Sequence, residues 1–113
     1  MTIAAIYAQL CCSDLKRSSE WFSAVFDRKP DATPMAGLAE WHHQQSAGFQ
    51  LYEERANAGR GTLTLIVKDL EGEHSRLVAA GLKPGEIEPA DYTTIMRLRD
   101  PDENLVVLAQ PSV

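Results

Sequence analysis

The chain has 113 residues, a formal net charge of −5 and a hydrophobic fraction of 44%, which fits one ordinary folded domain. Its Lys and Arg residues are scattered, so there is no basic stripe for nucleic acid. No apolar run approaches the roughly 20 residues that a membrane span needs. We therefore expect a cytoplasmic protein that binds a small molecule and has no nucleic-acid or membrane partner.

The first predicted element is a strand that contains the segment IYAQLC, residues 6 to 11. Ile6, Ala8 and Leu10 are apolar, whereas Tyr7 and Gln9 between them carry hydrogen-bonding groups. Side chains alternate between the two faces of a strand, so the apolar face belongs to the core. The other face has no charged residue and differs from an ordinary solvated face.

The strand ends at Cys11 and Cys12, the only cysteines of the chain. Neighbours on a strand point to opposite faces, so a disulfide between them is not expected. Both are interpreted as small apolar residues in a reducing compartment. The first ten residues lack the positive segment of a signal peptide. Both observations favour the cytoplasm.

Two segments then share an order of strand, Asp-Leu, helix and Lys-Pro. Asp14-Leu15 recurs 55 residues later as Asp69-Leu70, and Lys29-Pro30 recurs 54 residues later as Lys83-Pro84. Ser13 or Asp14 can cap the first helix, and Asp69 can cap the second. Residues at helical spacing form one face of each helix, namely Leu15, Ser18, Phe22 and Val25 in the first and Leu70, Leu77 and Ala80 in the second.

Three short strand-like runs follow each helix, at about 30–35, 38–44 and 46–53 and then at about 86–90, 93–99 and 104–110. Turn-forming residues separate these runs, as in the segment DPDEN before the last one. The pattern predicts β-α-β-β-β twice. The first module covers about 1–56 and the second about 60–113 of a single domain, 1–113.

The predicted sheets have two different faces. One face is uniformly apolar and should receive the helices; it comprises Ile6, Ala8, Leu10, Phe49, Leu51, Leu63, Leu65, Val106 and Leu108. The opposite face is uncharged and mixes polar with aromatic groups; it comprises Tyr7, Gln9, Gln50, Tyr52, Thr62, Thr64 and Val107. Neutral polar groups beside aromatic rings suit a small-molecule pocket. A partly wet surface or a subunit interface is the alternative interpretation.

Two motifs give the chain a resemblance to a known family. SDLKRSSEWFSAVF, at 13–26, resembles D-L-x-x-S-x-x-F-Y-x-x-V-L-G, and DPDENLVVL, at 100–108, is similar to D-P-D-G-N and the strand after it. The family is the vicinal oxygen chelate superfamily, which includes glyoxalase I, extradiol dioxygenases, fosfomycin-resistance enzymes and bleomycin-binding proteins. The resemblance implies an α+β fold of two βαβββ modules that form a curled mixed sheet around a cup, often completed by a second subunit. Glu103 replaces the usual Gly, so a reshaped turn is expected.

The resemblance also implies four metal-ligand positions, which hold His, Glu or Gln in metal-dependent members. Counted from the motifs, three positions fall at Tyr7, Thr62 and Val107, and the fourth falls at Gln50. Val107 cannot ligate a metal, and neutral Tyr and Thr are poor ligands. We therefore expect no metal and no other cofactor.

A few other residues are candidates for chemistry. His42 and His43 cannot chelate one ion together; one of them is either a base in the cup or a solvated or core histidine. Trp41 is either a stacking wall for a planar ligand or an aromatic that covers the sheet. Arg97 either holds an anionic group or lies on the surface. The predicted cup face has no carboxylate for acid–base catalysis, and Glu53-Glu54 is interpreted as a solvated boundary.

These observations predict a homodimer that binds an apolar or aromatic molecule in a metal-free cup, with sequestration of a drug or toxin as one use. The predicted binding residues are Tyr7, Gln9, Trp41, Gln50, Tyr52, Thr62, Thr64, Val107 and Arg97. No catalytic residue is assigned. The alternative is a lyase, isomerase or dioxygenase-like enzyme of the same superfamily, with a metal on other ligands or with a histidine base. A third possibility is an interaction module whose neutral face is buried in the dimer.

Overall fold

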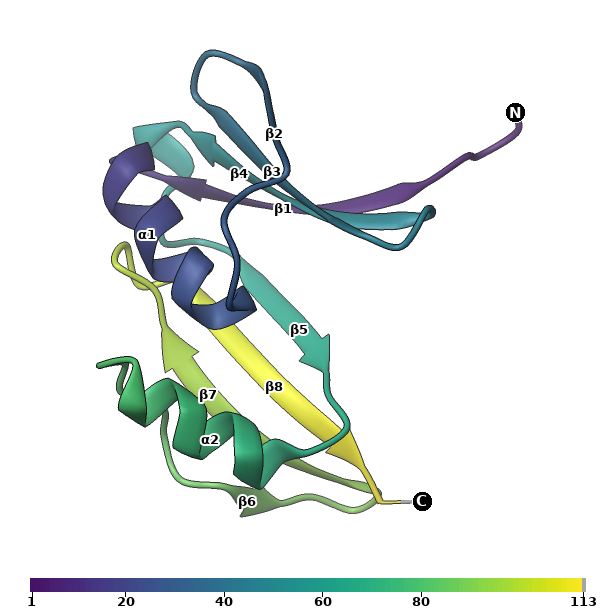
Figure 1. Ribbon diagram of the computed structural model, residues 1–113, viewed down its shortest axis with the longest axis vertical. Helices are drawn as coiled ribbons and strands as arrows, with labels where there is room; N and C mark the ends of the chain where they lie inside the picture. Colours follow the sequence, from purple (N-terminus) through teal and green to yellow (C-terminus); the bar gives the residue numbers. More distant parts are fainter. Residues whose placement is uncertain (113) are drawn as a thin grey trace.

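The structure is a computed structural model that describes residues 1–112, and it contains two similar modules in succession (Figure 1). The first module consists of β1 (Ile6–Cys12), α1 (Leu15–Phe26), β2 (Ala32–Met35), β3 (Leu38–His43) and β4 (Ala47–Glu53). After a short 3-10 helix, Arg55–Asn57, the second module consists of β5 (Thr62–Ile66), α2 (Leu70–Ala79), β6 (Glu88–Pro89), β7 (Thr93–Arg99) and β8 (Leu105–Pro111). The predicted order of elements is confirmed; residue 113 lies outside the described residues.

Each module forms its own four-stranded mixed sheet, sheet 1 in the order β1-β4-β3-β2 and sheet 2 in the order β5-β8-β7-β6. In both sheets the first and last strands of the module are parallel neighbours, and the other pairs are antiparallel. The sheet edges β1 and β5 approach each other where Leu10 lies against Gly61. The α+β fold of two βαβββ modules is therefore confirmed, with the two sheets remaining separate and unclosed.

The two helices begin in the same way. Asp14 accepts a hydrogen bond from the N–H of Arg17 at 3.1 Å, and Asp69 accepts one from the N–H of Gly72 at 3.1 Å. At each helix start, a second acceptor oxygen is provided by a side chain at the end of the last strand of the same module. Glu53 accepts from the N–H of Leu15 at 2.9 Å, and Gln110 accepts from the N–H of Leu70 at 2.8 Å. These bonds pair the N–H groups that the start of a helix leaves without intrahelical partners. Because the same arrangement occurs in both modules, the internal repeat is present in the structure as well as in the sequence.

The alternation predicted for β1, β4, β5 and β8 agrees with the register of the strands. Ala8 pairs with Phe49 and Leu65 pairs with Leu108 on the faces that carry the helices, which we call the helix-bearing faces. Phe22, Val25, Leu70 and Leu77 of the helices are buried in this core, whereas Ala80 is exposed just after α2. The expectation that the helices cover the whole apolar set is wrong for Ile6 and Ala8, which are exposed because the start of β1 projects beyond α1 (Figure 1).

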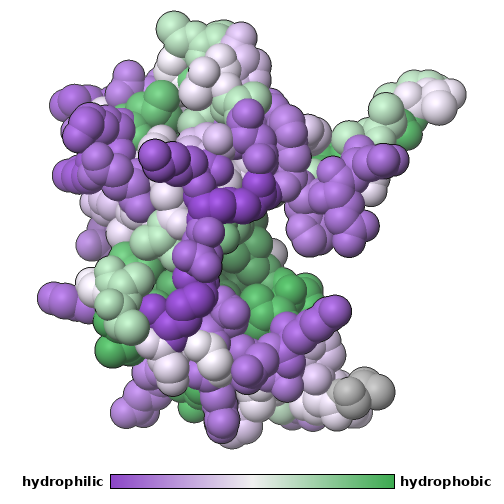
Figure 2. Space-filling view, viewed as in Figure 1, coloured by the Kyte–Doolittle hydropathy of each residue, from purple (hydrophilic) through white to green (hydrophobic). Residues whose placement is uncertain are grey.

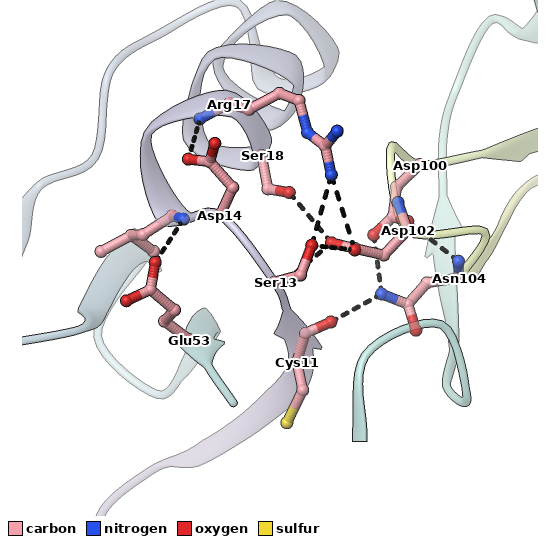
Figure 3. Close-up of polar contacts among 10 residues, drawn as sticks. Cys11, Ser13, Asp14, Arg17, Ser18, Glu53, Asp100, Asp102 and Asn104 are labelled. Atoms are coloured by element: carbon pink, nitrogen blue, oxygen red, sulfur yellow. Dashed lines mark hydrogen bonds and ion pairs between the residues drawn. The ribbon is translucent and has the colours of Figure 1, made fainter. Parts of the chain in front are cut away.

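The turn at residues 100–104, which we call the 100–104 turn, joins the second module to the first (Figure 3). Asp102 accepts hydrogen bonds from the backbone N–H of Ser13, at 3.0 Å, and from its hydroxyl. The carboxylate also accepts a hydrogen bond from the Ser18 hydroxyl at 3.4 Å and lies 3.6 Å from the guanidinium of Arg17. These contacts connect the two sequence motifs of the family, and each contact joins residues more than eighty positions apart.

Asn104 makes the most buried of these connections. Its side chain is fully buried, and its Nδ2 donates to the backbone carbonyl of Cys11 at 2.9 Å. The same nitrogen donates to Asp100 at 2.8 Å, and Oδ1 accepts from the N–H of Gly61 at 2.9 Å. A buried polar group left without a partner costs about 1–3 kcal/mol, so these bonds fix the angle between the modules.

Glu103, which stands where the family usually has Gly, has a φ of 74°. This is the left-handed region, which costs a residue with a side chain about 1 kcal/mol. The Glu103 N–H still donates to the carbonyl of Asp100 at 2.9 Å. The substitution is thus accommodated as local strain in a conformation that suits glycine, and the structure gives no support to a reshaped turn.

Neither helix in residues 1–112 is both long and apolar enough to span a membrane.

We predict that Gly59→Ala destabilises the protein much more than Gly81→Ala. Both glycines are left-handed, with φ values of 81° and 85°. A Cβ at Gly59 would overlap the backbone carbonyl oxygen of Asp102, whereas nothing lies within 4 Å of one at Gly81. Gly81→Ala should cost about 1 kcal/mol from the backbone conformation, and Gly59→Ala about 2 kcal/mol more from overpacking. Urea unfolding measures both; equal costs would contradict tight packing between the 100–104 turn and Gly59, which follows the 3-10 helix.

We also predict a pH-dependent stability from Asp102. Burial alone would raise the pKa of its carboxyl, but the hydrogen bonds from Ser13 and the charge of Arg17 outweigh burial and hold the pKa below its ordinary value. A lowered carboxyl pKa stabilises the folded state above the unfolded pKa, near 4, and this stabilisation is lost as the pH falls through the folded value. Asp102→Asn should therefore lower the free energy of unfolding at pH 7 by about 2 kcal/mol.

The difference between the parent chain and Asp102→Asn should shrink when the urea unfolding is repeated at about pH 3. Asp91→Asn, at an exposed position, serves as the matched control and should change little at either pH. A difference of the same size at both pH values would contradict a contribution from the Asp102 charge.

Candidate functional site

The faces opposite the helices, which we call the outer faces, hold most of the residues predicted to bind a ligand. On sheet 1 the register places Gln9, Gln50 and Glu40 side by side across β1, β4 and β3. Tyr7, Gly48 and His42 form the neighbouring row. Tyr52 pairs with Cys11 in the row beyond. The structure therefore brings Tyr7, Gln9, Gln50 and Tyr52 to one face, as predicted.

A chain of hydrogen bonds, which we call the polar row, crosses the outer face of sheet 1. Gln9 Nε2 donates to Gln50 Oε1 at 3.0 Å, and Gln50 Nε2 donates to Glu40 Oε2 at 2.7 Å. The second Glu40 oxygen lies 2.8 Å from His42 Nε2. The row thus contains four side chains, Gln9, Gln50, Glu40 and His42, each bonded to the next.

Glu40 sets the direction of this row. The hydrogen bond from Gln50, followed by the one from His42, holds the pKa of the Glu40 carboxyl below its ordinary value. An ionised carboxylate can only accept hydrogen bonds, so Gln50 must present its NH₂ group to Glu40 and its carbonyl oxygen to Gln9. Gln9 in turn uses its nitrogen, which leaves its carbonyl oxygen as an acceptor at the start of the row.

Tyr7 lies directly beside the polar row. Its ring rests over Gly48, where a Cβ would overlap the ring carbons. The ring also meets His42 edge-to-face, with 6.1 Å between ring centroids and an interplanar angle of 81°. Tyr7 is 38% exposed, so one side of the ring remains open to solvent. An aromatic surface next to oriented polar atoms is a common feature of small-molecule sites.

The backbone of His42 is fixed from the segment between α1 and β2. Its N–H donates to the Asp31 carboxylate at 2.6 Å. Arg28 pairs with the same carboxylate at 2.7 Å and donates to the His42 carbonyl. These contacts support the end of the polar row.

Two predictions for β3 are wrong. Trp41 does not line the predicted cup; it pairs with Phe49 on the helix-bearing face, is 2% exposed and packs against Phe22 and Phe26. Its indole N–H donates to the carbonyl of Arg28 at 3.0 Å. Because side chains alternate, Glu40 and His42 take the outer face instead. The expectation that this face has no carboxylate is therefore wrong as well.

The pairing of β3 with β4 contains the information that would have placed Trp41 correctly. His43 pairs with Ala47 across a three-residue turn, which places Trp41 opposite Phe49. Phe49 belongs to the predicted apolar set, so a prediction of this pairing would have assigned Trp41 to the core. His43 itself is exposed at the end of β3.

The outer face of sheet 2 holds the remaining predicted residues. Thr64 pairs with Val107, which pairs with Arg97 on β7. Thr62 lies two residues before Thr64 on the same face, and both threonines are exposed. Arg97 is ion-paired with Glu88 of β6 at 2.6 Å. Arg97 therefore does lie on the predicted face, although its charge is shared with a neighbouring carboxylate.

A cleft of about 790 Å³ lies between the helix-bearing faces, lined by Trp41 and Phe49 from sheet 1, by Leu63 and Leu65 from sheet 2, and by Phe26 of α1. We call this space the intermodule cleft. His42 and Gly48 of the outer face of sheet 1 and Thr64 of the outer face of sheet 2 also line this cleft.

The four positions at which related proteins hold a metal do not fit one here. Tyr7, Gln50, Thr62 and Val107 offer two hydroxyls, one amide and a hydrocarbon. The amide of Gln50 is already bonded to Gln9 and Glu40. Across residues 1–112, no three His, Cys, Asp or Glu side chains are grouped so that they could hold a metal ion. The donor chemistry of these side chains therefore does not match a divalent ion.

Comparison with solved structures finds the same fold in several proteins. A glyoxalase/bleomycin resistance protein from Catenulispora acidiphila superposes with a TM-score of 0.86 and 21% identity, over 95% of this chain and 97% of that one. TnmS3, an antibiotic binding protein from Streptomyces sp. CB03234, gives a TM-score of 0.79 and 17% identity, over 99% and 97%. Lactoylglutathione lyase from Agrobacterium tumefaciens gives 0.76 and 14%, over 95% and 92%. At these identities the likeness establishes the fold.

No functionally curated protein matches the sequence. The family model of the glyoxalase-like domain matches residues 5–109. That range covers both modules except the last two residues of β8, and it includes both motifs on which the resemblance rests. The chain therefore belongs to the glyoxalase-like domain family, within the vicinal oxygen chelate superfamily.

Proposed function

We propose that the protein is a homodimer that binds a small, largely apolar or aromatic molecule on the outer face of sheet 1, without a metal or other cofactor. Sequestration of a drug or toxin is the biological role that fits such binding. The observation that carries the proposal is the polar row beside the open ring of Tyr7. An ordinary solvated sheet face has separate charged side chains, whereas this face has a connected set with fixed orientation.

The orientation of the polar row limits the chemistry of the ligand. Gln9 offers its carbonyl oxygen as an acceptor, so the ligand should carry a hydroxyl or amine donor beside its planar part. The ring of Tyr7 supplies a surface for stacking, with about 1 kcal/mol expected from an aromatic pair beyond the buried area. A planar aromatic molecule with a phenol-like hydroxyl group satisfies both requirements.

The separation of the two sheets supports the proposed homodimer. The outer faces of sheets 1 and 2 belong to two separate, unclosed sheets, and neither sheet encloses a ligand alone. A second copy would set a sheet 2 outer face, with Thr62, Thr64, Val107 and Arg97, opposite a sheet 1 outer face. Dimers with twofold symmetry form two such sites at once. TnmS3, similar in fold, is described as an antibiotic binding protein, which supports small-molecule binding as the function of this chain.

The proposal includes a cytoplasmic location, for which the cysteines are the support. Cys11 and Cys12 are both free. Burial raises the pKa of the Cys12 thiol to about 12, so it stays a neutral buried group. Free thiols of this kind suit a reducing compartment.

One observation favours a second candidate, a metal-free enzyme with a histidine base. Glu40 lies 2.8 Å from His42 Nε2, and a carboxylate at one ring nitrogen fixes the other as a possible proton acceptor. His42 is on the outer face beside Tyr7, where the proposed ligand lies. A lyase or isomerase that removes a proton from a bound molecule would use this pair.

We predict that the protein binds planar phenols and naphthols and that the polar row and Tyr7 determine the affinity. Isothermal titration calorimetry against a panel of these compounds measures the dissociation constant. Gln50→Leu breaks the row at its centre, and Gly48→Ala displaces the Tyr7 ring. Each should weaken binding at least tenfold, since about 1.4 kcal/mol corresponds to a factor of ten. Gln45→Leu, on the exposed β3–β4 turn, is the control and should bind normally.

If no compound of the panel binds, or if Gln50→Leu and Gly48→Ala bind as well as the control, the proposed site is wrong.

We further predict that the purified protein carries no stoichiometric zinc, nickel, iron or manganese and returns its ligand unchanged. Elemental analysis after dialysis tests the first point, and mass spectrometry of the ligand after incubation tests the second. Stoichiometric metal would overturn the metal-free proposal. A changed ligand in the parent chain, but not in His42→Gln, would replace binding by the histidine-base enzyme.

A further inference from the structure

Two arginines lie next to each other on the outer face of sheet 2. Arg97 and Arg99 are two residues apart on β7, so their side chains share a face, and both are exposed. In the register, Arg97 pairs with Val107 and Arg99 pairs with Leu105 of β8. The described strands of sheet 2 contain one carboxylate, Glu88, against these two guanidinium groups. The outer face of sheet 2 therefore has an excess of positive charge.

The two arginines differ in the partners of their charge. Arg97 is ion-paired with Glu88 at 2.6 Å. Arg99 donates from Nη1 to the backbone carbonyl of Glu103 at 3.2 Å, and this acceptor is neutral. Among residues 1–112, the arginines in ion pairs are Arg17, Arg28, Arg76 and Arg97. The Arg99 guanidinium, which has five N–H donors, is therefore oriented by a neutral partner and keeps its charge available.

The neighbours of Arg99 across the sheet suit an aromatic acid. Leu105 lies beside it and is half-buried, and Thr62 lies beside Leu105 on β5. Adjacent strands are about 4.8 Å apart, so one small ligand can contact all three side chains. Leu105 offers an apolar surface, and the Thr62 hydroxyl can donate or accept a hydrogen bond. A guanidinium binds a carboxylate through two parallel N–H bonds, so this row can receive an aromatic ring together with its acid group.

The overall charge of the molecule opposes the binding of anions elsewhere. The chain has a formal net charge of −5, and hydrophilic side chains cover much of the face that Figure 2 shows. On the outer face of sheet 1 the polar row contains the carboxylate of Glu40, whose pKa is held below its ordinary value. This negative charge repels an acidic group of a ligand. Sheet 2 is therefore the favourable place for such a group.

We propose that Arg99 determines the specificity of the ligand site by binding a carboxylate group, so that the ligand is a hydroxylated aromatic acid. The hydroxyl of the ligand donates to Gln9 on sheet 1, and its carboxylate accepts from Arg99 on the sheet 2 that faces it in the dimer. Arg97 stays paired with Glu88 and adds positive potential nearby. This inference rests on the proposed function, which places one outer face of each kind around the ligand, and it names the class of that ligand.

Calorimetric titration at neutral pH with matched pairs of compounds tests this role. The pairs are naphthol with hydroxynaphthoate and phenol with hydroxybenzoate, and the members of each pair differ by one carboxylate. The parent chain should bind each acid at least tenfold more tightly than its neutral partner, because a hydrogen bond to a charged group contributes about this factor. Arg99→Gln should lose the preference and bind the neutral compounds as the parent does. Arg55→Gln, at an exposed arginine of the 3-10 helix, is the matched control and should keep the preference.

Two further measurements separate a charge contact from a change in structure. Arg99→Lys keeps the charge but not the two parallel donors, so its preference for the acids should be smaller than that of the parent but still present. The preference of the parent should also fall as the salt concentration rises from about 0.05 M to about 0.5 M. Circular dichroism confirms that the variants are folded. Equal affinity of the parent for acid and neutral compound, or an equal loss for both in Arg99→Gln, would overturn the inference.

These outcomes are distinct from those of the first ligand experiment. If neutral phenols bind in a manner sensitive to Gln50→Leu and the acids bind no better, only the role of Arg99 is refuted. If the acids bind through Arg99 but are unaffected by Gln50→Leu and Gly48→Ala, the carboxylate contact stands and the proposed site on sheet 1 is refuted. Binding of neither class of compound would overturn both.

Discussion

The buried amide of Asn104 holds the two modules at the angle on which the rest of the structure depends. It bonds to the backbone of Cys11 in the first module and of Gly61 at the entry to the second. Backbone groups cannot change rotamer to find other partners, so a different angle would leave both unpaired in the protein interior. This angle turns the helix-bearing faces toward each other across the intermodule cleft. It also brings the sheet edges β1 and β5 together where Leu10 lies against Gly61.

Most of the fold was predictable because its signals are local or repeated. The alternation in β1, β4, β5 and β8 has a period of two and needs only the sequence of each strand. The Asp-Leu pairs predict both helix starts, since Asp14 and Asp69 cap their helices through the same bond. The roles of Glu53 and Gln110 at those helix starts were not predictable, because each bond joins residues about forty positions apart.

Site residues were predictable on strands whose two faces differ clearly in polarity. They were not predictable on a strand whose buried face is determined only by its pairing with a neighbouring strand. In β3, Trp41 lies on one face and Glu40 and His42 lie on the other. Both faces therefore carry candidate binding residues, and the alternation of side chains alone does not show which face is buried. The register with β4 decides it, through the pairing of Trp41 with Phe49. Glu40 on the outer face was also not predicted, because its carboxylate is hydrogen-bonded to Gln50 and His42. A charged residue indicates an ordinary solvated face only when it has no such partners.

The two modules repeat the same backbone but present different outer faces, and this difference suits a shared site. Sheet 1 contributes the polar row and the Tyr7 ring, whose positions are fixed by Glu40 and Gly48. Sheet 2 contributes the short side chains of Thr62, Thr64 and Val107, together with Arg97, which is ion-paired with Glu88. Fixed groups determine which molecule fits, and short side chains provide the volume that it occupies. In a twofold dimer that places a sheet 1 outer face opposite a sheet 2 outer face, both sites would have this combination. Pairing sheet 1 with sheet 1 and sheet 2 with sheet 2 would instead give one site with little space and one site without the oriented polar row.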